Sequence, residues 1–349
     1  MELSLKRLRM LRELARRGTM TEAAEALHYT PSAVSQQLSA LEREVGVALL
    51  EHVGRRVRLT EAGQVLARHA VEVLAAEERA RTALEQAREH LTADLTVGVL
   101  ATLAGTLVPP ALATLAERHP GVRVTTREVV PEETHAAVRD GDLDLAFVLD
   151  YPAVPGSGPP DPALESTVIG VEPLLLVTPR GAFGGGAAGD PRGAGDALDT
   201  RDDARDARNG LGSRDDGART GLGPPVDLAD LSEHTWVASG TGTEFGRVLL
   251  ALCRAAGFTP RLAHQIDEQA TAMAMVAAGL GVTMVAELAM ALRPAGVDVF
   301  PFREPVERRI TVIRKASTRD RPSEQAFLRA ALDTAASLRL RKTPAGRTA

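Results

Sequence analysis

Residues 30–46, TPSAVSQQLSALEREVG, combine an apolar stripe with a face of short, uncharged polar side chains. The apolar residues recur at three- and four-residue steps and predict the buried side of a helix: Val34, Leu38, Leu41 and Val45. The polar residues begin the opposite face: Ser32, Ser35, Gln36 and Ser39. Such side chains can hydrogen-bond to base edges in a DNA major groove, where Gln pairs with adenine. The alternative is an ordinary solvated face, although surface helices usually carry charged residues there.

The segments before residue 30 position this helix. Residues 4–17 predict a first helix that ends at Gly18, and a second helix follows to about Leu27. Thr30 suits the N-cap and Pro31 the first turn of the third helix. Two helices joined by a three-residue turn form a helix-turn-helix. We therefore expect DNA contacts from the start and the exposed face of the third helix, at Thr30, Pro31, Ser32, Ala33, Ser35, Gln36 and Ser39.

Residues 49–60, LLEHVGRRVRLT, alternate around Gly54 and predict a two-stranded wing. We expect Arg55 and Arg56 near its tip to contact phosphate or the minor groove, with a solvated hairpin as the alternative. Residues 1–60 carry ten Arg or Lys against seven Glu, a net charge of +3, whereas the whole chain carries −5. The basic excess is local to the N-terminus, as expected if only this part meets phosphate.

The segment AAEALHYTPSAVSQQLSALEREVGVALLE, followed by RRVRLTEAG, resembles the winged helix-turn-helix of LysR-type transcriptional regulators. The matching positions are the run 33–35, the pair Leu41-Glu42, Gly46 and the segment 59–63. The chain departs from the family at Leu50 and His52, where Phe and Arg are usual, and at Gln36, where Arg is common. The resemblance implies a DNA-binding regulator with a winged fold.

A long helix is predicted after the wing. Between residues 60 and 91 there is no Pro, and Gly63 is the only Gly. About thirty residues at 1.5 Å each give a rod of roughly 45 Å. Its apolar stripe has no adjacent partner in sequence, so we expect residues 61–91 to pair two subunits; packing on its own domain is the alternative. The resemblance implies a homodimer or a tetramer, in which this helix pairs two subunits and spaces their DNA-reading domains.

Residues 92–340 alternate short apolar runs with helices in two similar β-α-β sets, which predicts an α/β domain of two lobes. The pattern resembles the LysR-type effector domain, which is akin to periplasmic solute-binding proteins. By that resemblance lobe I spans about 92–170 and 297–340, and lobe II spans about 171–296. Residues 341–349 are predicted to form a flexible tail. The predicted fold class is therefore multidomain α/β: an N-terminal all-α winged helix-turn-helix, a linker helix and a two-lobed effector domain.

A small-molecule effector is expected in a cleft between these lobes, at strand ends and helix N-termini. The candidate contacts that follow strands or precede a helix are Ala101, Thr102, Leu149, Asp150, Ser239, Gly240, Thr241 and Gly242. The resemblance adds Gln265 and Glu268. A simple cap and turn is the alternative for the SGTG stretch, 239–242. Its glycines are mis-spaced for a G-x-G-x-x-G dinucleotide loop. No decisive Arg or Lys occurs among the candidates, so the charge of the effector stays open.

Residues 181–225 are dominated by Gly, Ala, Asp and Arg. They have too few large apolar residues to offset their ordering entropy, so we predict a disordered insert. The family usually has a much shorter loop here.

The sequence offers no enzyme chemistry. The eight histidines have no zinc-site spacing, and no Ser-His-Asp set is evident. We therefore expect no catalytic residues, no metal and no cofactor. The single Cys253 lies on an apolar helical stripe, which predicts a buried core residue. One cysteine, no secretory signal and no apolar run long enough for a membrane span predict a cytoplasmic protein.

The function that these patterns predict is a homo-oligomeric transcription regulator that binds double-stranded DNA under the control of a small molecule. Two alternatives stay open. In one, the chain is a cytoplasmic small-molecule-binding protein whose N-terminal helices serve only assembly. In the other, the cleft holds an enzyme, for which no catalytic constellation is found. The effector, the operator, and activation versus repression are not predicted.

Overall fold

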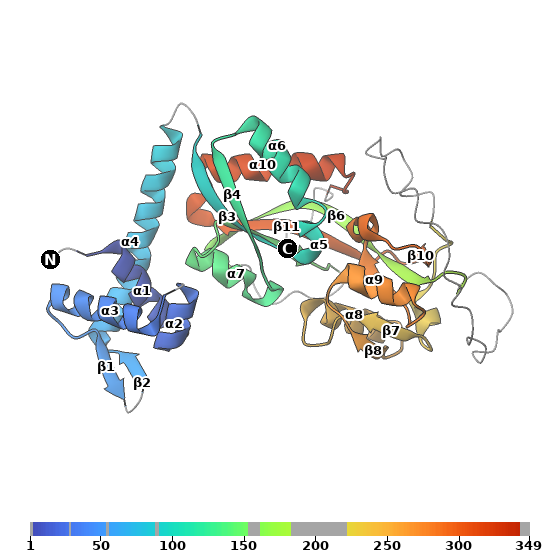
Figure 1. The fold of residues 1–349 in the computed structure, drawn as a ribbon, viewed down its shortest axis with the longest axis horizontal. Helices are drawn as coiled ribbons and strands as arrows, with labels where there is room; N and C mark the ends of the chain where they lie inside the picture. Colours follow the sequence, from blue (N-terminus) through green and yellow to red (C-terminus); the bar gives the residue numbers. More distant parts are fainter. Residues whose placement is uncertain are drawn as a thin grey trace, which may run out of the picture. The chain divides into compact units, whose positions relative to one another are not determined.

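The computed structural model describes residues 3–27, 29–53, 56–87, 91–152, 161–182 and 222–342 (Figure 1). The chain divides into two compact units. One unit is Met1–Ala93 with Lys315–Gln325, and the other is Asp94–Arg314 with Ala326–Ala349. Most of the predicted disordered insert (183–221), the predicted phosphate contact Arg55 and residues 343–349 of the predicted tail lie outside the described residues.

The N-terminal unit begins with three helices: α1 (Leu5–Arg17), α2 (Met20–Ala26) and α3 (Pro31–Val45). The hydroxyl of Thr30 accepts a hydrogen bond from the N–H of Ala33 at 3.2 Å, which confirms the predicted N-cap. α1 and α3 both end at a glycine in the left-handed region, Gly18 (φ 79°) and Gly46 (φ 72°). The three helices share one apolar core, which includes Leu11, Val34, Leu38, Leu41 and Leu49.

The wing follows as β1 (Leu50–Val53) and β2 (Arg56–Leu59), which pair antiparallel with Leu50 opposite Leu59. Thr60 caps the long helix α4 (Glu61–Gln86) by accepting from the N–H of Gly63. A Cβ at Gly63 would lie 2.2 Å from the carbonyl oxygen of Leu49, so only glycine lets the helix approach the wing this closely. The 26 residues of α4 make a rod of about 39 Å.

Helix α1 carries a buried carboxylate that its own arginines neutralise. Glu13 is fully buried, and its Oε2 accepts from Arg16 at 2.5 Å while its Oε1 accepts from Arg12 at 3.0 Å. Burial alone would raise the pKa of Glu13, but the Arg16 and Arg12 guanidinium groups outweigh it and hold the pKa below its ordinary value. Arg9 of the same helix pairs with Glu77 of α4 at 2.6 Å, which ties the two helices together.

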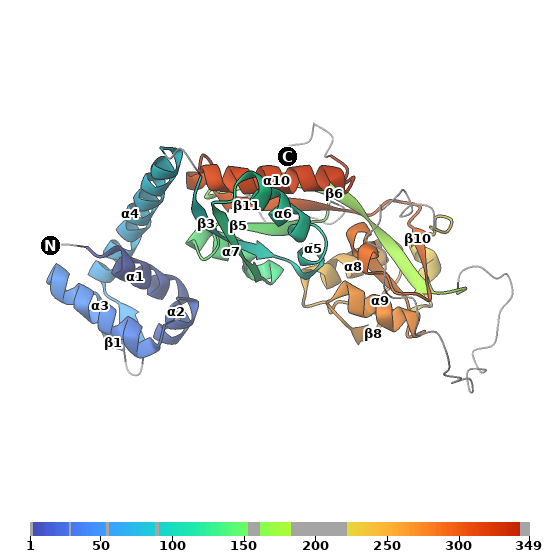
Figure 2. The same ribbon diagram turned by 45° about the horizontal axis from the view of Figure 1, so that its top comes forward.

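The second unit contains a mixed sheet in the order β10-β6-β11-β5-β3-β4, with β9 also paired to β6. Its first lobe is formed by β3 (Ala93–Val99), β4 (Val122–Glu128), β5 (Leu145–Asp150) and part of the long strands described below. The helices of this lobe are α5 (Ala101–Ala104), α6 (Val108–Arg118), α7 (Pro131–Asp140) and α10 (Pro322–Ser337). Helices α6 and α10 run over the same face of the sheet (Figure 2), where Arg118 pairs with Asp333.

The second lobe has strands β7 (Thr235–Ala238), β8 (Arg261–Gln265), β9 (Thr283–Ala286) and β10 (Val297–Pro301). Helices α8 (Glu244–Ala255) and α9 (Gln269–Ala277) pack with them, together with short 3-10 turns at Leu228–Leu231 and Glu287–Leu292. Buried Trp236 and Met284 lie in the core of this lobe.

One long strand, β6 (Leu164–Pro179), pairs with β9 and β10 of the second lobe and with β11 (Glu307–Lys315), which in turn pairs with β5 of the first lobe. The sequence pattern predicted only the apolar second half of β6, from Leu174, because Glu165, Ser166 and Thr167 interrupt the first half. Strand β10 was not predicted at all, since VDVFP is short and contains Asp298 and Pro301. The predicted multidomain α/β fold is otherwise confirmed.

Within the described ranges, no helix is both long and apolar enough to span a membrane.

Candidate nucleic-acid interface and effector site

Helix α3 presents the two faces that its sequence predicted. Val34, Leu38 and Leu41 are fully buried. On the opposite side Ser32, Ser35, Gln36 and Ser39 are exposed, as are Thr30 and Pro31, and Ala33 is half-buried. The hydroxyl of Thr30 serves the cap and lies 3.0 Å from Ser32 Oγ. Of these side chains, Ser35, Gln36 and Ser39 thus project from a rigid helix without a role in its cap.

The neighbouring glutamine has a different environment. Gln37 is half-buried, and its Oε1 accepts a hydrogen bond from Arg7 Nε at 3.0 Å, which links α3 to α1. Arg7 also pairs with Glu44 on the last turn of α3. The two adjacent glutamines therefore have different roles. Gln37 links α3 to α1 by a hydrogen bond, and Gln36 is exposed to solvent.

Glu42 is a functional candidate that the sequence reasoning missed. Its Oε1 accepts from the backbone N–H groups of Leu49 at 2.8 Å and Leu50 at 2.9 Å. One carboxylate thereby fixes the start of the wing relative to the end of α3. The signal was present as the Leu41-Glu42 pair, but a sequence cannot show which backbone groups a glutamate will reach. The predicted phosphate contact Arg55 lies outside the described residues, as does the side chain of Arg56, whose backbone pairs with Val53.

The end of β5 meets the first turn of α8, so residues of the two lobes come together here. Tyr151 contacts Phe245 with ring centroids 5.9 Å apart. Glu132, on α7 of the first lobe, accepts from the N–H of Glu244 at 3.1 Å and lies 3.6 Å from Arg247 Nη2. The pKa of Glu244 is raised above its ordinary value. Burial is the largest cause, and the nearby Glu132 carboxylate is the second.

Beside this contact lies a buried charged group at the point where the chain crosses between lobes. Arg308 of β11 is 1% exposed and bonds through Nε to Glu172 Oε1 of β6 at 2.9 Å. Glu172 Oε2 accepts from the N–H of Leu288 at 2.7 Å. Tyr151 interacts with Arg308, and burial raises the pKa of its phenol. The sequence signal for this group was a single Glu inside the apolar run GVEPLLLVTP, because a charge there has to be paired.

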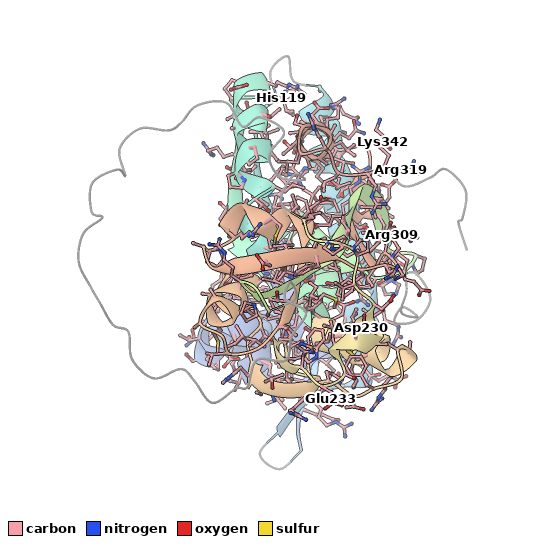
Figure 3. All side chains as sticks on the ribbon, turned by 90° about the vertical axis from the view of Figure 1, so that its right-hand side faces the viewer. His119, Asp230, Glu233, Arg309, Arg319 and Lys342 are labelled. Carbon is pink, nitrogen blue, oxygen red and sulfur yellow. The ribbon has the colours of Figure 1, made fainter. Side chains whose placement is uncertain are left out.

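The predicted effector residues are distributed as follows. Asp150 ends β5, and its Oδ2 lies 3.3 Å from Nη1 of Arg309, which is labelled in Figure 3. Leu149 packs against the core of the second lobe. Ser239 is buried, and Gly240 is close to Gln265, since a Cβ at Gly240 would lie 2.7 Å from Gln265 Oε1.

The remaining predicted positions lie at helix starts. Thr241 and Gly242 are exposed just before Thr243, which caps α8 through the N–H of Gly246 at 3.1 Å. Glu268 is used by its own helix, because its carboxylate accepts from the N–H groups of Ala270 and Thr271. Burial would raise the pKa of Glu268, but these N–H groups hold it below its ordinary value.

Ala101 and Thr102 open the short helix α5. Among the hydrogen bonds of the described residues, none joins them to the SGTG segment.

Other chemistry is scarce in the described part of the chain. No group of three His, Cys, Asp or Glu there is placed to hold a metal ion. Cys253 is fully buried in α8, and burial raises the pKa of its thiol to about 12. Charged side chains such as Asp230, Glu233 and Lys342 point outward into solvent (Figure 3).

A winged helix-turn-helix joined through a long helix to a two-lobed α/β domain defines a DNA-binding regulator with a ligand-sensing domain. Residues 5–64 match the family model of bacterial regulatory helix-turn-helix proteins of the lysR family, and residues 88–198 and 212–336 match the LysR substrate binding domain. The chain belongs to the LysR family. It is a transcription regulator that binds DNA and a small-molecule effector and works as an oligomer.

Individual relatives agree with this assignment. The chain is 26% identical over 301 residues to the uncharacterized HTH-type transcriptional regulator YcgK of Bacillus subtilis, which covers 86% of this chain and 85% of that one. It is 38% identical over 141 residues to a probable hydrogen peroxide-inducible genes activator of Mycobacterium xenopi, covering 40% of this chain and 75% of that one. The fold is similar to that of a full-length OxyR variant from Pseudomonas aeruginosa, with a TM-score of 0.60 at 20% identity and 95% of each chain covered.

Proposed function

We propose that α3 reads the operator through Ser32, Ser35, Gln36 and Ser39, with Thr30, Pro31 and Ala33 close to the DNA backbone and Arg55 and Arg56 of the wing on phosphate. The observation that carries this proposal is the exposure of the polar face of α3 while its other face is fully buried. A helix held by its apolar side and by Gln37 presents the polar side chains in one fixed orientation, which base-specific hydrogen bonds need.

The effector, in this proposal, binds where the end of β5 meets the SGTG segment and the start of α8. Asp150 and Leu149 supply one wall, and Ser239, Gly240, Thr241, Gly242 and Gln265 supply the other; Ala101, Thr102 and Glu268 complete the set predicted from the sequence. The contacts between Glu132 and Glu244 and between Tyr151 and Phe245 support this location, because they bring residues of the two lobes together. A ligand that binds one arrangement of the lobes better than another would shift their equilibrium.

The domain limits that accompany this function are 1–60 for DNA reading, 61–91 for dimerisation and 92–340 for effector binding. Pairing through α4 is supported by its exposed apolar residues, which include Val65, Val71, Val73 and Leu84. At its start lies an open apolar groove of about 500 Å³, lined by Leu3, Val45, Val47, Leu49, Val65 and Leu66 among others. We propose that a second copy of the chain covers these surfaces. The protein then acts by binding and not by catalysis, in the cytoplasm where bacterial DNA lies.

Peroxide sensing is the other function that the relatives suggest. A thiolate is the form of cysteine that reacts with peroxide, so a sensor needs an accessible thiol with a low pKa. The chain has one cysteine, which is buried in α8 with its thiol pKa raised to about 12. We therefore favour a non-covalent effector over a thiol-based signal.

Fluorescence anisotropy of the full-length protein on a duplex from upstream of its own gene tests the DNA-reading proposal, with a scrambled duplex and a salt series alongside. Specific binding that weakens steeply with salt is expected, and the Ser35→Ala, Gln36→Ala variant should bind both duplexes alike. Gln64→Ala, which removes an exposed glutamine from α4, is the matched control and should keep the preference. A double variant that still prefers the upstream duplex as strongly as the parent would contradict the assignment of these side chains.

A further inference from the structure

The segment Lys315–Gln325, which we name the strap, has an unexpected position in the chain. It begins at the last residue of β11 and includes the first residues of α10, and the rest of both elements belongs to the effector unit. The strap itself belongs to the compact unit of residues 1–93. The chain therefore leaves the effector unit at Arg314, contributes to the N-terminal unit, and returns at Ala326.

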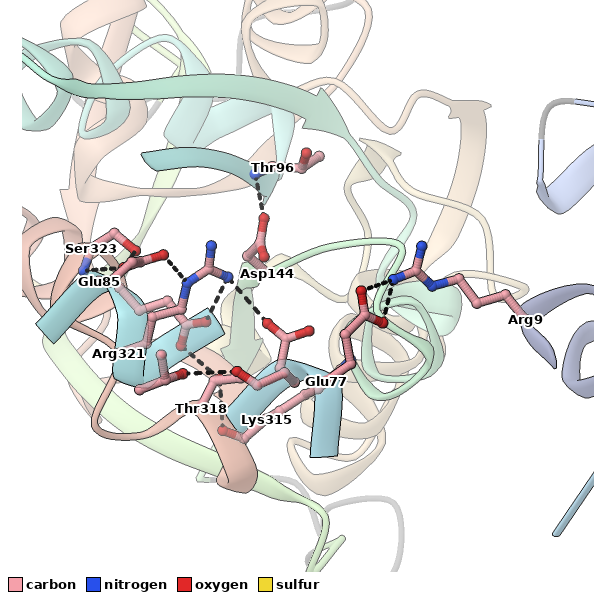
Figure 4. A network of polar contacts seen from close by, with 12 residues as sticks. Arg9, Glu77, Glu85, Thr96, Asp144, Lys315, Thr318, Arg321 and Ser323 are labelled. Atoms are coloured by element: carbon pink, nitrogen blue, oxygen red, sulfur yellow. Dashed lines mark hydrogen bonds and ion pairs between the residues drawn. The ribbon is translucent and has the colours of Figure 1, made fainter. Parts of the chain in front are cut away.

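Arg321 anchors the strap to the last turns of α4 (Figure 4). Its Nε bonds to Glu85 Oε1 at 2.7 Å, and its Nη1 lies 3.3 Å from Glu78 Oε1. Nη1 also lies 3.6 Å from Glu324 Oε1 within the strap. Arg321 is 4% exposed and Glu85 is 8% exposed. A guanidinium removed from water and shared among carboxylates has one strongly preferred position, because moving it would leave buried charges unpaired.

Further hydrogen bonds join the strap to α4. The hydroxyl of Ser323 donates to Glu85 Oε2 at 2.7 Å, and its backbone N–H donates to the same oxygen at 3.3 Å. Gln86 Nε2, at the end of α4, donates to the carbonyl oxygen of Asp320 at 3.0 Å. Within the strap, Thr318 donates to Glu324 Oε2 at 2.8 Å. The strap is thus bonded to α4 through side chains and backbone at several points, over two turns of the helix.

Strand β11 joins the strap to the crossing point between the lobes. It lies between β6 and β5, so both of its edges are paired. Arg308 near its start belongs to the buried group with Glu172 and Tyr151, and Arg314 near its end bonds to Glu165 of β6 at 2.9 Å. Nine residues of strand span about 30 Å. A central strand with both edges paired is a stiff element, so displacement at one end is carried to the other.

We propose that β11 and the strap form a mechanical link through which the arrangement at Arg308 and Glu172 sets the stability of the last turns of α4. A change in the angle between the lobes then reaches the helix that spaces the DNA-reading domains, through a strand that is continuous with the anchor. This link connects the effector site proposed above to α4. Its role in regulation therefore rests on that proposed function. Its test uses neither operator nor effector, so the two proposals can fail separately.

Hydrogen exchange of the full-length protein, followed by mass spectrometry, measures this link. Glu172→Gln loosens the lobe crossing, and exchange at the N–H of Leu288, which bonds to Glu172, reports that it has done so. The expected result is about threefold faster exchange at residues 78–87, the last turns of α4 and its C-cap, in this variant. Arg321→Gln should raise exchange there about tenfold by itself. In the double variant, Glu172→Gln should add no further increase.

Arg118→Gln is the matched control, because it removes a guanidinium bonded to α10 outside the strap; exchange at residues 78–87 should stay unchanged. Where Glu172→Gln does not fold, Tyr151→Phe loosens the same group by removing only its hydroxyl. Faster exchange at Leu288 without any change at residues 78–87 would overturn the proposal. The proposal would also be overturned if Glu172→Gln raised exchange at residues 78–87 by the same factor in the parent and in Arg321→Gln. The coupling would then not pass through the strap.

Discussion

The carboxylate of Glu132 on one lobe of the effector unit caps the first N–H of α8 on the other lobe, at Glu244. A negative charge at a helix N-terminus is favourable, and Arg247 adds to the attraction from 3.6 Å. The same carboxylate repels that of Glu244, which is half-buried, so one contact both holds the lobes together and perturbs a titrating group.

Replacing Glu132 by Gln should lower the pKa of Glu244 toward its ordinary value, because one of the causes that raise it is removed while burial stays. Titration of the Glu244 side-chain carbon signal by NMR measures this shift. Glu133→Gln serves as the control, since it removes an exposed charge from the same turn of α7. An unchanged Glu244 titration in Glu132→Gln would show that the two carboxylates do not interact in solution.

Replacing Glu42 by Ala should destabilise the N-terminal unit by about 1–3 kcal/mol, because the buried N–H of Leu49 loses its acceptor. The wing should also lose its fixed orientation on α3, so DNA affinity should fall while the salt slope stays close to that of the parent. Urea unfolding and anisotropy provide the two measurements. Glu25→Ala, an exposed glutamate on α2, should change neither. Parental stability of Glu42→Ala would contradict the role assigned to this carboxylate.

The stability of the N-terminal unit should fall in acid through Glu13. The folded pKa of Glu13 is lowered, so the unfolded chain takes up a proton at higher pH than the folded chain does. Its stabilisation is therefore complete above the ordinary pKa of 4.5 and is lost as the pH falls below that value through the folded pKa. The free energy of unfolding, measured by urea titration between about pH 6 and pH 3, should fall less steeply in Glu13→Gln. If the free energy of unfolding fell equally steeply with pH in the parent and in Glu13→Gln, Glu13 would not be a cause of the lost stability in acid.

Charge placed on the exposed stripe of α4 should separate the subunits. Val73 is 38% exposed, and Val73→Asp would bury a carboxylate if a second copy covers the helix. We expect the dimer to dissociate at least about tenfold more readily in sedimentation velocity over a range of concentrations. Val130→Asp, on an exposed valine that precedes α7, is the comparison and should sediment as the parent does. A Val73→Asp protein that remains as tightly associated would place the interface elsewhere.

Alkylation of Cys253 should be slow in the folded protein. With a thiol pKa of about 12 the reactive thiolate is scarce at pH 8, and burial in α8 blocks the reagent as well. Iodoacetamide labelling followed by mass spectrometry should proceed about a hundredfold more slowly than in denatured chain. Labelling at the denatured rate would reopen the possibility of a thiol-based signal.

Local chemistry made the DNA-reading unit predictable from the sequence. Thr30 and Pro31 mark the start of α3 whatever surrounds them, and the spacing of Val34, Leu38 and Leu41 identifies its buried side. The effector unit depends on contacts between distant residues. Glu132 and Glu244 are separated by more than a hundred positions, and nothing in the neighbourhood of either indicates the other.

Pairs between distant residues also explain why the sequence did not predict the first half of β6. The first half of β6 carries Glu165 and other polar residues that look like a loop, yet Arg314 of β11 pairs with Glu165 and the strand continues. Glu172 could be recognised as a charge in need of a partner, but its partner Arg308 lies 136 positions away. A sequence shows that such a charge must be compensated; only the fold shows by which residue.

Strand β6 has a consequence for how proteins of this architecture acquire new effectors. One continuous strand of 16 residues is paired with β11 on the side of the first lobe and with β9 and β10 of the second lobe. A chimera that exchanged a single lobe would have to keep the pairing of this one strand with β9, β10 and β11. Point substitutions in the loops near the lobe contact, such as residues 239–242, leave these strand pairings unchanged, so we expect new ligand preferences to arise there.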